Sequence, residues 1–189
     1  MSAPALLERF IGSFAYLIPL GVTVDGAVVS ATVKPDITPL TNWTDYNIGS
    51  VLGFNPGAET EDRSYKKPNA RGGWIKVPRT VAVADFVDLK TREMGELLLR
   101  LQFGLTDAIV EGTAQTIFGN SVRTIQAWAK FHLRQEDGTD LCIGDMLCYV
   151  ELKKGIVGDG KVTEPEFRLT CIPEVDGVLV AGNSIVFPA

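Results

Sequence analysis

Apolar and polar residues alternate along the second half of the chain, a pattern that predicts antiparallel strands. From Ile125 to Leu133 every second residue is apolar, and the residues between them are mostly polar. Successive side chains of a strand point to opposite faces, so this period of two predicts a strand with one apolar face. Similar stretches at 141–154, 167–171 and 178–187 are separated by turn sequences. With a further strand at Thr80–Val87, the pattern predicts an antiparallel meander.

One segment has the period of a helix instead. Apolar residues recur three and four positions apart between Lys90 and about Phe103, at Met94, Leu97, Leu98 and Leu101, with Leu105 beyond. This spacing places them on one face of an amphipathic helix that packs on a core. The fold class expected is therefore mainly β: an antiparallel β-sandwich or open barrel, one flanking α-helix and a long extended loop.

The long loop is expected at residues 55–73, which are rich in charge, proline and glycine. Its acidic residues come first and its basic residues follow, so the segment could complement a copy of itself; the alternative is an ordinary solvated loop. The candidate assembly residues are Glu59, Glu61, Asp62, Arg63, Lys66, Lys67 and Arg71.

Residues 1–40 are interpreted as an N-terminal arm or edge strands, and residues 41–189 as the main β domain. The apolar run 10–24 imitates a signal-peptide core, but residues 1–9 carry one acid and one base, and Pro19 and Gly21 interrupt it. It is also too short to span a bilayer, so no membrane association is expected. Asp25-Gly26 between apolar pairs predicts a tight hairpin.

The charge and the cysteine content limit the classes of protein to which this chain could belong. The 189 residues include 18 basic and 23 acidic side chains, a formal net charge of −5, which argues against a DNA-reading protein. The three cysteines, at 142, 148 and 171, lack the spacing of a disulfide framework and are interpreted as buried small residues in a reducing compartment. Cys171 could alternatively pair with one of the others across strands.

No catalytic, cofactor-binding or metal-binding residues are expected. The single histidine, His132, has no ligand motif around it and is interpreted as an exposed surface residue. The glycine-rich segment 155–160 joins two strands, whereas phosphate-binding loops lead into a helix. Trp128 lies among the polar positions of its strand, so it is a candidate exposed contact residue, or a rim residue covered by a loop.

The order of these pieces resembles the major tail tube proteins of long-tailed bacteriophages. The resemblance covers roughly residues 40–189. It rests on Trp43 with Ile48-Gly-Ser-Val51 before the long loop, the strand Trp74–Val87, and the helix containing Leu97-Leu-Leu99. The closing meander adds Phe167 to Pro173, followed by Asp176-Gly177.

The resemblance implies a structural virion protein of the phage tail, assembled in the host cytoplasm. Six subunits would form a ring around an inner β-barrel, and stacked rings would make a hollow tube through which DNA passes without specific binding. The long loop would reach a neighbouring ring. Partners would include tape measure, tail terminator and baseplate or tip proteins, and no cofactor is implied.

Two other classes remain open. Another virion β-protein, such as a tail terminator, head–tail connector or capsid decoration protein, would stop at one ring or coat a shell. A soluble binding or enzymatic β-domain would need a cleft with convergent polar groups, which the sequence does not supply.

Overall fold

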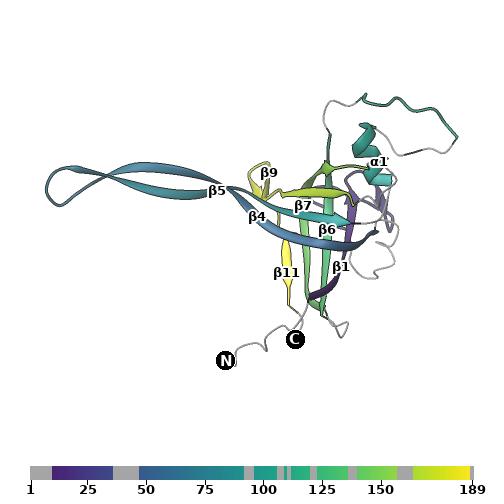
Figure 1. Ribbon diagram of the computed structural model, residues 1–189, viewed down its shortest axis with the longest axis horizontal. Helices are drawn as coiled ribbons and strands as arrows, with labels where there is room; N and C mark the ends of the chain where they lie inside the picture. The colour runs from purple at the N-terminus through teal and green to yellow at the C-terminus, as the bar shows by residue number, and fades with distance from the viewer. Residues whose placement is uncertain are drawn as a thin grey trace.

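The computed structural model describes residues 10–35, 47–91, 96–105, 109, 112–119, 123–135, 140–156 and 164–187. Eleven strands and one helix lie in these ranges (Figure 1). They are β1 (Phe10–Pro19), β2 (Thr23–Val24), β3 (Ala27–Val28), β4 (Asn47–Pro68), β5 (Trp74–Thr91), α1 (Glu96–Phe103), β6 (Thr124–Gln135), β7 (Asp140–Lys154), β8 (Glu166–Cys171), β9 (Glu174–Val175), β10 (Val178–Leu179) and β11 (Ser184–Val186).

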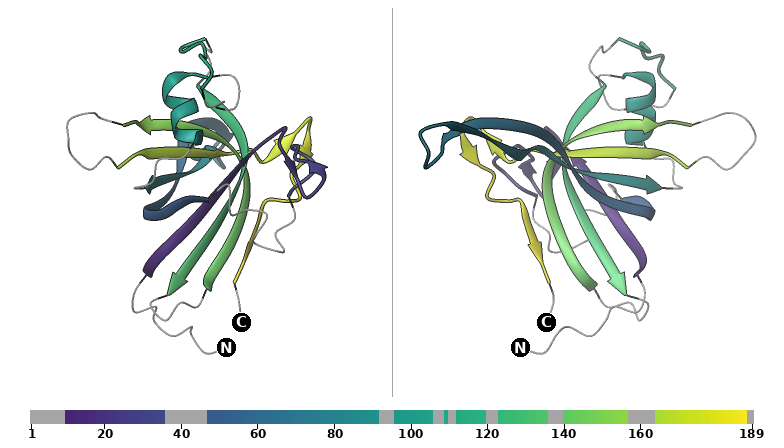
Figure 2. Two further views of the ribbon diagram at one scale, coloured as in Figure 1. Left: turned by 90° about the vertical axis from the view of Figure 1, so that its right-hand side faces the viewer. Right: turned by 60° about the vertical axis from the view of Figure 1, so that its left-hand side comes forward.

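The main sheet closes on itself. Its strand order is β11-β7-β6-β1-β4-β5-β8, and β8 also pairs with β7, so six antiparallel strands form a closed ring of pairings. The strands β4, β5 and β8 run crosswise to β1, β6 and β7 (Figure 2). The predicted mainly-β antiparallel architecture with one helix is confirmed, and closure removes most of the free sheet edges that such a fold would otherwise expose.

The core lies inside this barrel, and α1 closes over it. Leu98 and Leu101 of the helix are buried against apolar residues of the surrounding strands, as the helical period predicts. Gln102 at the end of the helix fixes it to the chain after β7, because its amide accepts a hydrogen bond from Ile156 N at 2.9 Å and donates one to Ile156 O at 3.3 Å. The principal core residues are Ala15, Leu17, Leu89, Leu98, Leu101, Ala127, Ala129, Phe131, Cys148, Val150, Phe167 and Leu169.

A second apolar cluster covers the outer face of β6. It joins Ile18 of β1, Trp128 of β6 and Leu147 of β7 to Val24, Val29 and Ile172. The covering residues come from the β2–β3 hairpin and from the chain after β8. Because both of its faces are covered, β6 is buried along most of its length.

The helix begins later than its sequence pattern predicts. Lys90 and Thr91 belong to the end of β5, and α1 spans only Glu96–Phe103. Thr91 is buried and donates a hydrogen bond from its hydroxyl to Ile48 O at 3.1 Å, which anchors this end of β5 to β4. The predicted helical residue Met94 lies outside the described residues.

The segment 55–73, predicted to be a loop, is instead the greater part of a strand followed by a short turn. Residues 55–68 continue β4, and they pair with β5 in a ladder that extends to Pro68 opposite Trp74. Only residues 69–73 form a turn. The prediction failed because both faces of this hairpin are exposed to solvent, so its strands have no apolar period to mark them.

The N-terminal strand also differs from its prediction. β1 lies between β6 and β4 in the sheet, an interior position, so residues 10–19 are part of the barrel and not an edge strand or an arm. The Asp25-Gly26 hairpin is confirmed: β2 and β3 pair around these two residues, which both have positive φ, 50° and 78°. Asp176 and Gly177 form an equivalent turn between β9 and β10.

Candidate assembly surface

The distal parts of β4 and β5 form a two-stranded arm that extends far from the barrel (Figure 1). Residues 58–80 are exposed, except for Gly73 and Val77, which are half-buried. Asn69 closes the tip, because its side-chain oxygen accepts hydrogen bonds from Arg71 N at 3.0 Å and Gly73 N at 2.9 Å. The arm is therefore a defined hairpin with almost all of its surface available to a partner.

Arg168 of β8 ties the root of the arm to the barrel. Its guanidinium donates two hydrogen bonds to the Asp88 carboxylate, from Nε at 2.8 Å and from Nη2 at 2.9 Å. A third bond, from Nη1 to Glu59, measures 3.3 Å. The hydrogen bonds from Arg168 hold the pKa of Asp88 below its usual value of 3.8. The arm thus leaves the barrel from a fixed point.

A stacked layer completes the root. The Arg168 guanidinium carbon lies 4.0 Å from the centre of the Phe86 ring, in cation–π geometry. Phe86 in turn lies over Gly57, its partner across the two strands. A Cβ at residue 57 would lie 2.7 Å from the ring, so the glycine leaves the space that Phe86 occupies.

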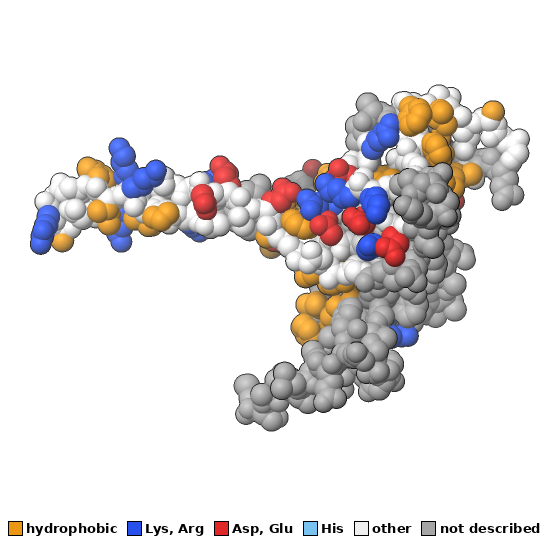
Figure 3. All heavy atoms as spheres, in the orientation of Figure 1, with side chains coloured by type: hydrophobic (Ala, Val, Ile, Leu, Met, Phe, Trp, Pro, Cys, Tyr) orange, Lys and Arg blue, Asp and Glu red, His pale blue; other side chains and the backbone are white. Residues whose placement is uncertain are grey.

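The seven charged residues predicted as assembly candidates are distributed along this arm. Glu59 contacts Arg168 at the root, and Glu61 accepts hydrogen bonds from Arg63 at 2.8 and 3.0 Å. Asp62 accepts one from the Thr80 hydroxyl at 2.7 Å. Lys66, Lys67 and Arg71 lie nearer the tip. Figure 3 shows acidic side chains near the barrel and basic side chains towards the tip. The arm places all seven on one projection.

Trp128 is not an exposed contact residue. Its side chain is 1% exposed, and its indole Nε1 donates a hydrogen bond to Ser30 O at 2.9 Å. The alternative interpretation, a residue covered by a loop, matches this position. His132 was likewise predicted to be exposed and is 4% exposed, with its ring edge-on to Tyr16 at 6.0 Å between centroids. The Trp128 prediction failed because the segments around Ser30 and Ile172, distant in sequence, cover this part of β6.

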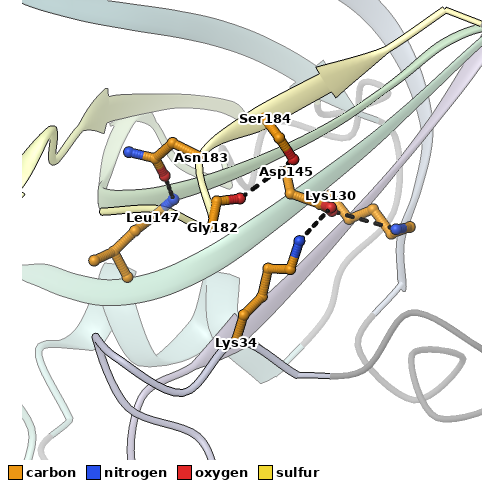
Figure 4. Close-up of polar contacts among 7 residues, drawn as sticks. All are labelled: Lys34, Lys130, Asp145, Leu147, Gly182, Asn183 and Ser184. Carbon is orange, nitrogen blue, oxygen red and sulfur yellow. Dashed lines mark hydrogen bonds and ion pairs between the residues drawn. The ribbon is translucent and has the colours of Figure 1, made fainter. Parts of the chain in front are cut away.

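Two lysines share one buried carboxylate on the same face (Figure 4). Lys130 and Lys34 approach Asp145 at 3.2 and 3.0 Å, one at each carboxylate oxygen. Nearby, the Asn183 side chain accepts a hydrogen bond from Leu147 N at 2.7 Å and donates one to Ile172 O at 2.9 Å. These bonds attach the N-terminal segment and the C-terminal segment to the barrel.

A smaller apolar surface lies at the C-terminal end of the chain. Ile185 and Val186 of β11 and the following Phe187 are 58–67% exposed. In the described part of the chain, β11 pairs only with β7. Val178 and Leu179 of β10 are also largely exposed. This edge is a second candidate contact surface, because a strand paired on one side can accept another strand.

Two of the open cavities in the described part of the chain flank the barrel. One of about 370 Å³ lies beside the arm root and is lined by Asp88, Lys90, Lys153, Glu166 and Arg168, among others. Among its charged side chains, Asp88 pairs with Arg168, Lys90 with Glu164 at 2.6 Å, and Lys153 with Glu151 at 3.1 Å. A second cavity of about 530 Å³ lies between α1 and β7 and contains Arg123 and Glu151.

Within the ranges that the structure describes, no three His, Cys, Asp or Glu side chains are placed to hold a metal ion. The same ranges contain no helix with both the length and the apolar character to cross a bilayer. Cys142 and Cys148 are buried, as expected, and Cys171 is half-buried.

Sequence reasoning missed Arg168 and the Lys130–Asp145 pair. Arg168 lies 80 residues from Asp88 in the chain, so only the β5–β8 pairing brings them together. Lys130 occupies one of the outward positions of β6 that the alternation marks as polar, which gave no sign that this face would be covered.

Comparisons with known proteins are sparse. No family model matches the chain, and no curated protein matches it. A solved structure that shares some similarity is a chain of the anti-feeding prophage baseplate, determined by cryo-EM with six-fold symmetrisation. The two chains are 13% identical, the match covers 90% of this chain and 91% of the other, and the TM-score is 0.33.

Proposed function

We propose that this chain is a structural virion subunit rather than an enzyme. In this proposal, copies of the barrel associate side by side into rings, and the rings stack into the hollow tail tube of a long-tailed phage. The β4–β5 arm reaches from one ring to a subunit of the next. This is the function implied by the order of sequence elements that resembles tail tube proteins.

The observation that carries the proposal is the arm itself. A two-stranded hairpin alone is marginally stable in water, because it has no third strand or helix to bury its faces. Here the ladder continues from Glu59 opposite Ala84 to Pro68 opposite Trp74, and residues 59–80 are exposed apart from Gly73 and Val77. Contact with another subunit would stabilise such a projection, because it would cover the exposed faces of the two strands.

The charge of the rest of the chain suits a conduit for DNA. Outside residues 63–79 the sequence has twelve basic and 23 acidic residues, a formal net charge of −11. A lumen lined by such barrels would repel phosphates and let DNA slide without specific binding. The exposed β11 edge offers a lateral contact, because ring formation covers sheet edges that would otherwise remain open.

The proposal is tested by shortening the arm. Thr60 and Ala82 are directly opposite each other, so residues 61–81 can be replaced by an Asn-Gly turn without changing the register below them. We expect the shortened protein to keep its fold, measured by circular dichroism and thermal unfolding, because residues 61–80 are exposed apart from Gly73 and Val77. In negative-stain electron microscopy, the wild type should form tubes and the shortened protein should form at most single rings.

Other outcomes distinguish the alternatives. Tubes formed equally by the shortened protein would exclude the arm as the stacking contact. Single closed rings from the wild type would favour a tail terminator or connector. A wild type that stays monomeric at high concentration and in the presence of preformed tail tips would favour a soluble binding domain.

A further inference from the structure

Folding of the arm separates its charges completely. The distal half, residues 63–79, contains six basic residues and no acidic one: Arg63, Lys66, Lys67, Arg71, Lys76 and Arg79. The proximal half, residues 53–62 and 80–88, contains five acidic residues and no basic one: Glu59, Glu61, Asp62, Asp85 and Asp88. Because the register brings these stretches together, the arm is a rod with a positive tip and a negative root.

Strand pairing in the positive tip places basic side chains directly opposite each other. Arg63 lies directly opposite Arg79, and Lys66 lies directly opposite Lys76. Like charges in directly opposed positions destabilise a strand pair. Glu61 offsets Arg63 through two hydrogen bonds, but the distal half contains no carboxylate that could offset Lys66 and Lys76. An acidic surface placed against the tip would relieve the repulsion between these two lysines.

The tip also carries apolar surface that a partner could cover. Trp74 is 68% exposed, Tyr65 is 51% exposed and Ile75 is 47% exposed. Aromatic and basic side chains together are typical of the residues that contribute most to binding at protein interfaces. Trp74 shares a face with Lys76 and Lys66, because residues two apart on a strand and directly opposed residues point to the same side.

We infer that the tip of one arm docks on the root of the arm of a second copy of this chain. Charge complementarity favours a second copy of the chain as the binding partner. The face with Lys66 and Lys76 at the tip has Asp62 and Asp85 at the root, and the face with Arg63 has Glu59 and Glu61. The face with Lys66, Lys76, Asp62 and Asp85 therefore matches a second rod that is displaced along its length. On the other face, Glu59 and Glu61 already pair with Arg168 and Arg63.

A second copy fits the tip better than nucleic acid does. The chain outside the tip has a formal net charge of −11, which repels phosphates while it attracts the tip of another subunit. A tip-to-root contact is also heterologous, since two different patches meet, and repetition of such a contact builds a ring or a filament. This inference rests on the proposed function and names the acceptor surface of the stacking contact.

The test is a charge swap between tip and root. The tip-reversed variant is Lys66→Glu/Lys76→Glu, and the root-reversed variant is Asp62→Lys/Asp85→Lys. Each variant alone should raise the concentration needed for self-association by about tenfold or more, because like charges then meet in the contact. An equimolar mixture should restore self-association, since each reversed tip then finds a root of opposite charge. Sedimentation velocity at 50 and 500 mM NaCl provides the measurement.

Salt and a matched variant serve as controls. Wild-type self-association should weaken at 500 mM NaCl, because exposed charges are screened there. Arg123→Glu/Lys154→Glu makes the same change in net charge as the tip-reversed variant, at exposed positions outside the arm, and should associate like the wild type. Both arm variants change only exposed side chains, so they should unfold at the same temperature as the wild type.

The inference is overturned if the single variants associate like the wild type, or if the mixture fails to restore association. It is also overturned if the tip-reversed variant loses binding to a fluorescent 30-nucleotide DNA but keeps its self-association, which would make the tip a nucleic-acid site. Electron microscopy separates this inference from the proposed function. Tubes that persist in both variants would leave the function intact and reject the docking site. Salt-sensitive, swap-restored oligomers without tubes would support the docking and reject the tube.

Discussion

Lys130 of β6 and Asp145 of β7 lie directly opposite each other, and their charged groups are 3.2 Å apart on a covered face of the sheet. The Lys130 side chain is fully buried and that of Asp145 is 6% exposed, whereas Lys34, on the other carboxylate oxygen, is 29% exposed. A buried ammonium depends on its carboxylate far more than an exposed one does, because water cannot replace the carboxylate.

Asp145→Ala should therefore destabilise the protein by about 3–5 kcal/mol, since it leaves a buried positive charge without this carboxylate. Urea unfolding followed by circular dichroism measures the change. Lys34→Ala is the matched control, and it should cost about 1 kcal/mol or less because the lysine is partly solvated. Equal effects of the two substitutions would show that Lys130 is stabilised mainly by other groups.

The Arg168–Asp88 pair predicts a dependence of stability on pH. The pKa of Asp88 is lowered in the folded protein by its hydrogen bonds with Arg168, so the carboxylate stabilises the fold above its usual pKa of 3.8. That contribution is lost as the pH falls through the lowered pKa, because the proton then binds the folded state as well. Arg168→Gln should reduce the free energy of unfolding more at pH 7 than at pH 2.5.

Measurement of unfolding at both pH values, together with an NMR titration of Asp88, checks this prediction. Arg63→Gln is the control, because the Arg63–Glu61 pair is exposed on both sides and should change stability little at either pH. An Arg168→Gln effect that is the same at pH 7 and pH 2.5 would show that packing on Phe86 dominates over charge.

The inward face of β6 was predictable from its sequence, and the outward face was not. Ala127, Ala129 and Phe131 show the period of two that a barrel core requires, and all three are buried. Trp128 lies on the other face, and it is buried because the segments around Ser30 and Ile172 cover it. Periodicity reports the character of a face, but it contains no information about which distant segment covers that face.

The arm shows a second limit of prediction from sequence periodicity. A hairpin exposed on both faces has the composition of a loop, so residues 55–73 were interpreted as one. The order of acids before bases at Glu59–Arg71 was visible in the sequence, and it indicated self-complementarity. The returning strand has the reverse order, with Lys76 and Arg79 before Asp85 and Asp88. Only the hairpin register shows that this order places residues of like charge side by side.

Gly182 is predicted to be intolerant of a side chain because it lies against the Trp128 ring. A Cβ at this position would overlap the ring, with Trp128 Cζ3 at 2.9 Å and Lys34 Cδ at 3.3 Å. Gly182→Ala should cost about 1–3 kcal/mol, the usual effect of overpacking. It should also shift the tryptophan fluorescence, since Trp128 is buried and Trp74 is exposed. Ala181→Ser, at the exposed neighbouring position, should leave both stability and fluorescence unchanged.

Cys148 and Cys171 are directly opposite on β7 and β8, and both thiols should react slowly in the folded protein. Burial raises the pKa of the Cys148 thiol far above its usual value of 9.0, and burial also raises the pKa of Cys171. Because the thiolate is the reactive form, labelling with a chromogenic disulfide reagent at pH 7.5 should be slow. The same reagent should label all three cysteines rapidly in urea. Rapid labelling of one thiol in the folded state would mean that β8 opens locally, and mass spectrometry of the labelled peptide would show whether that thiol is Cys171.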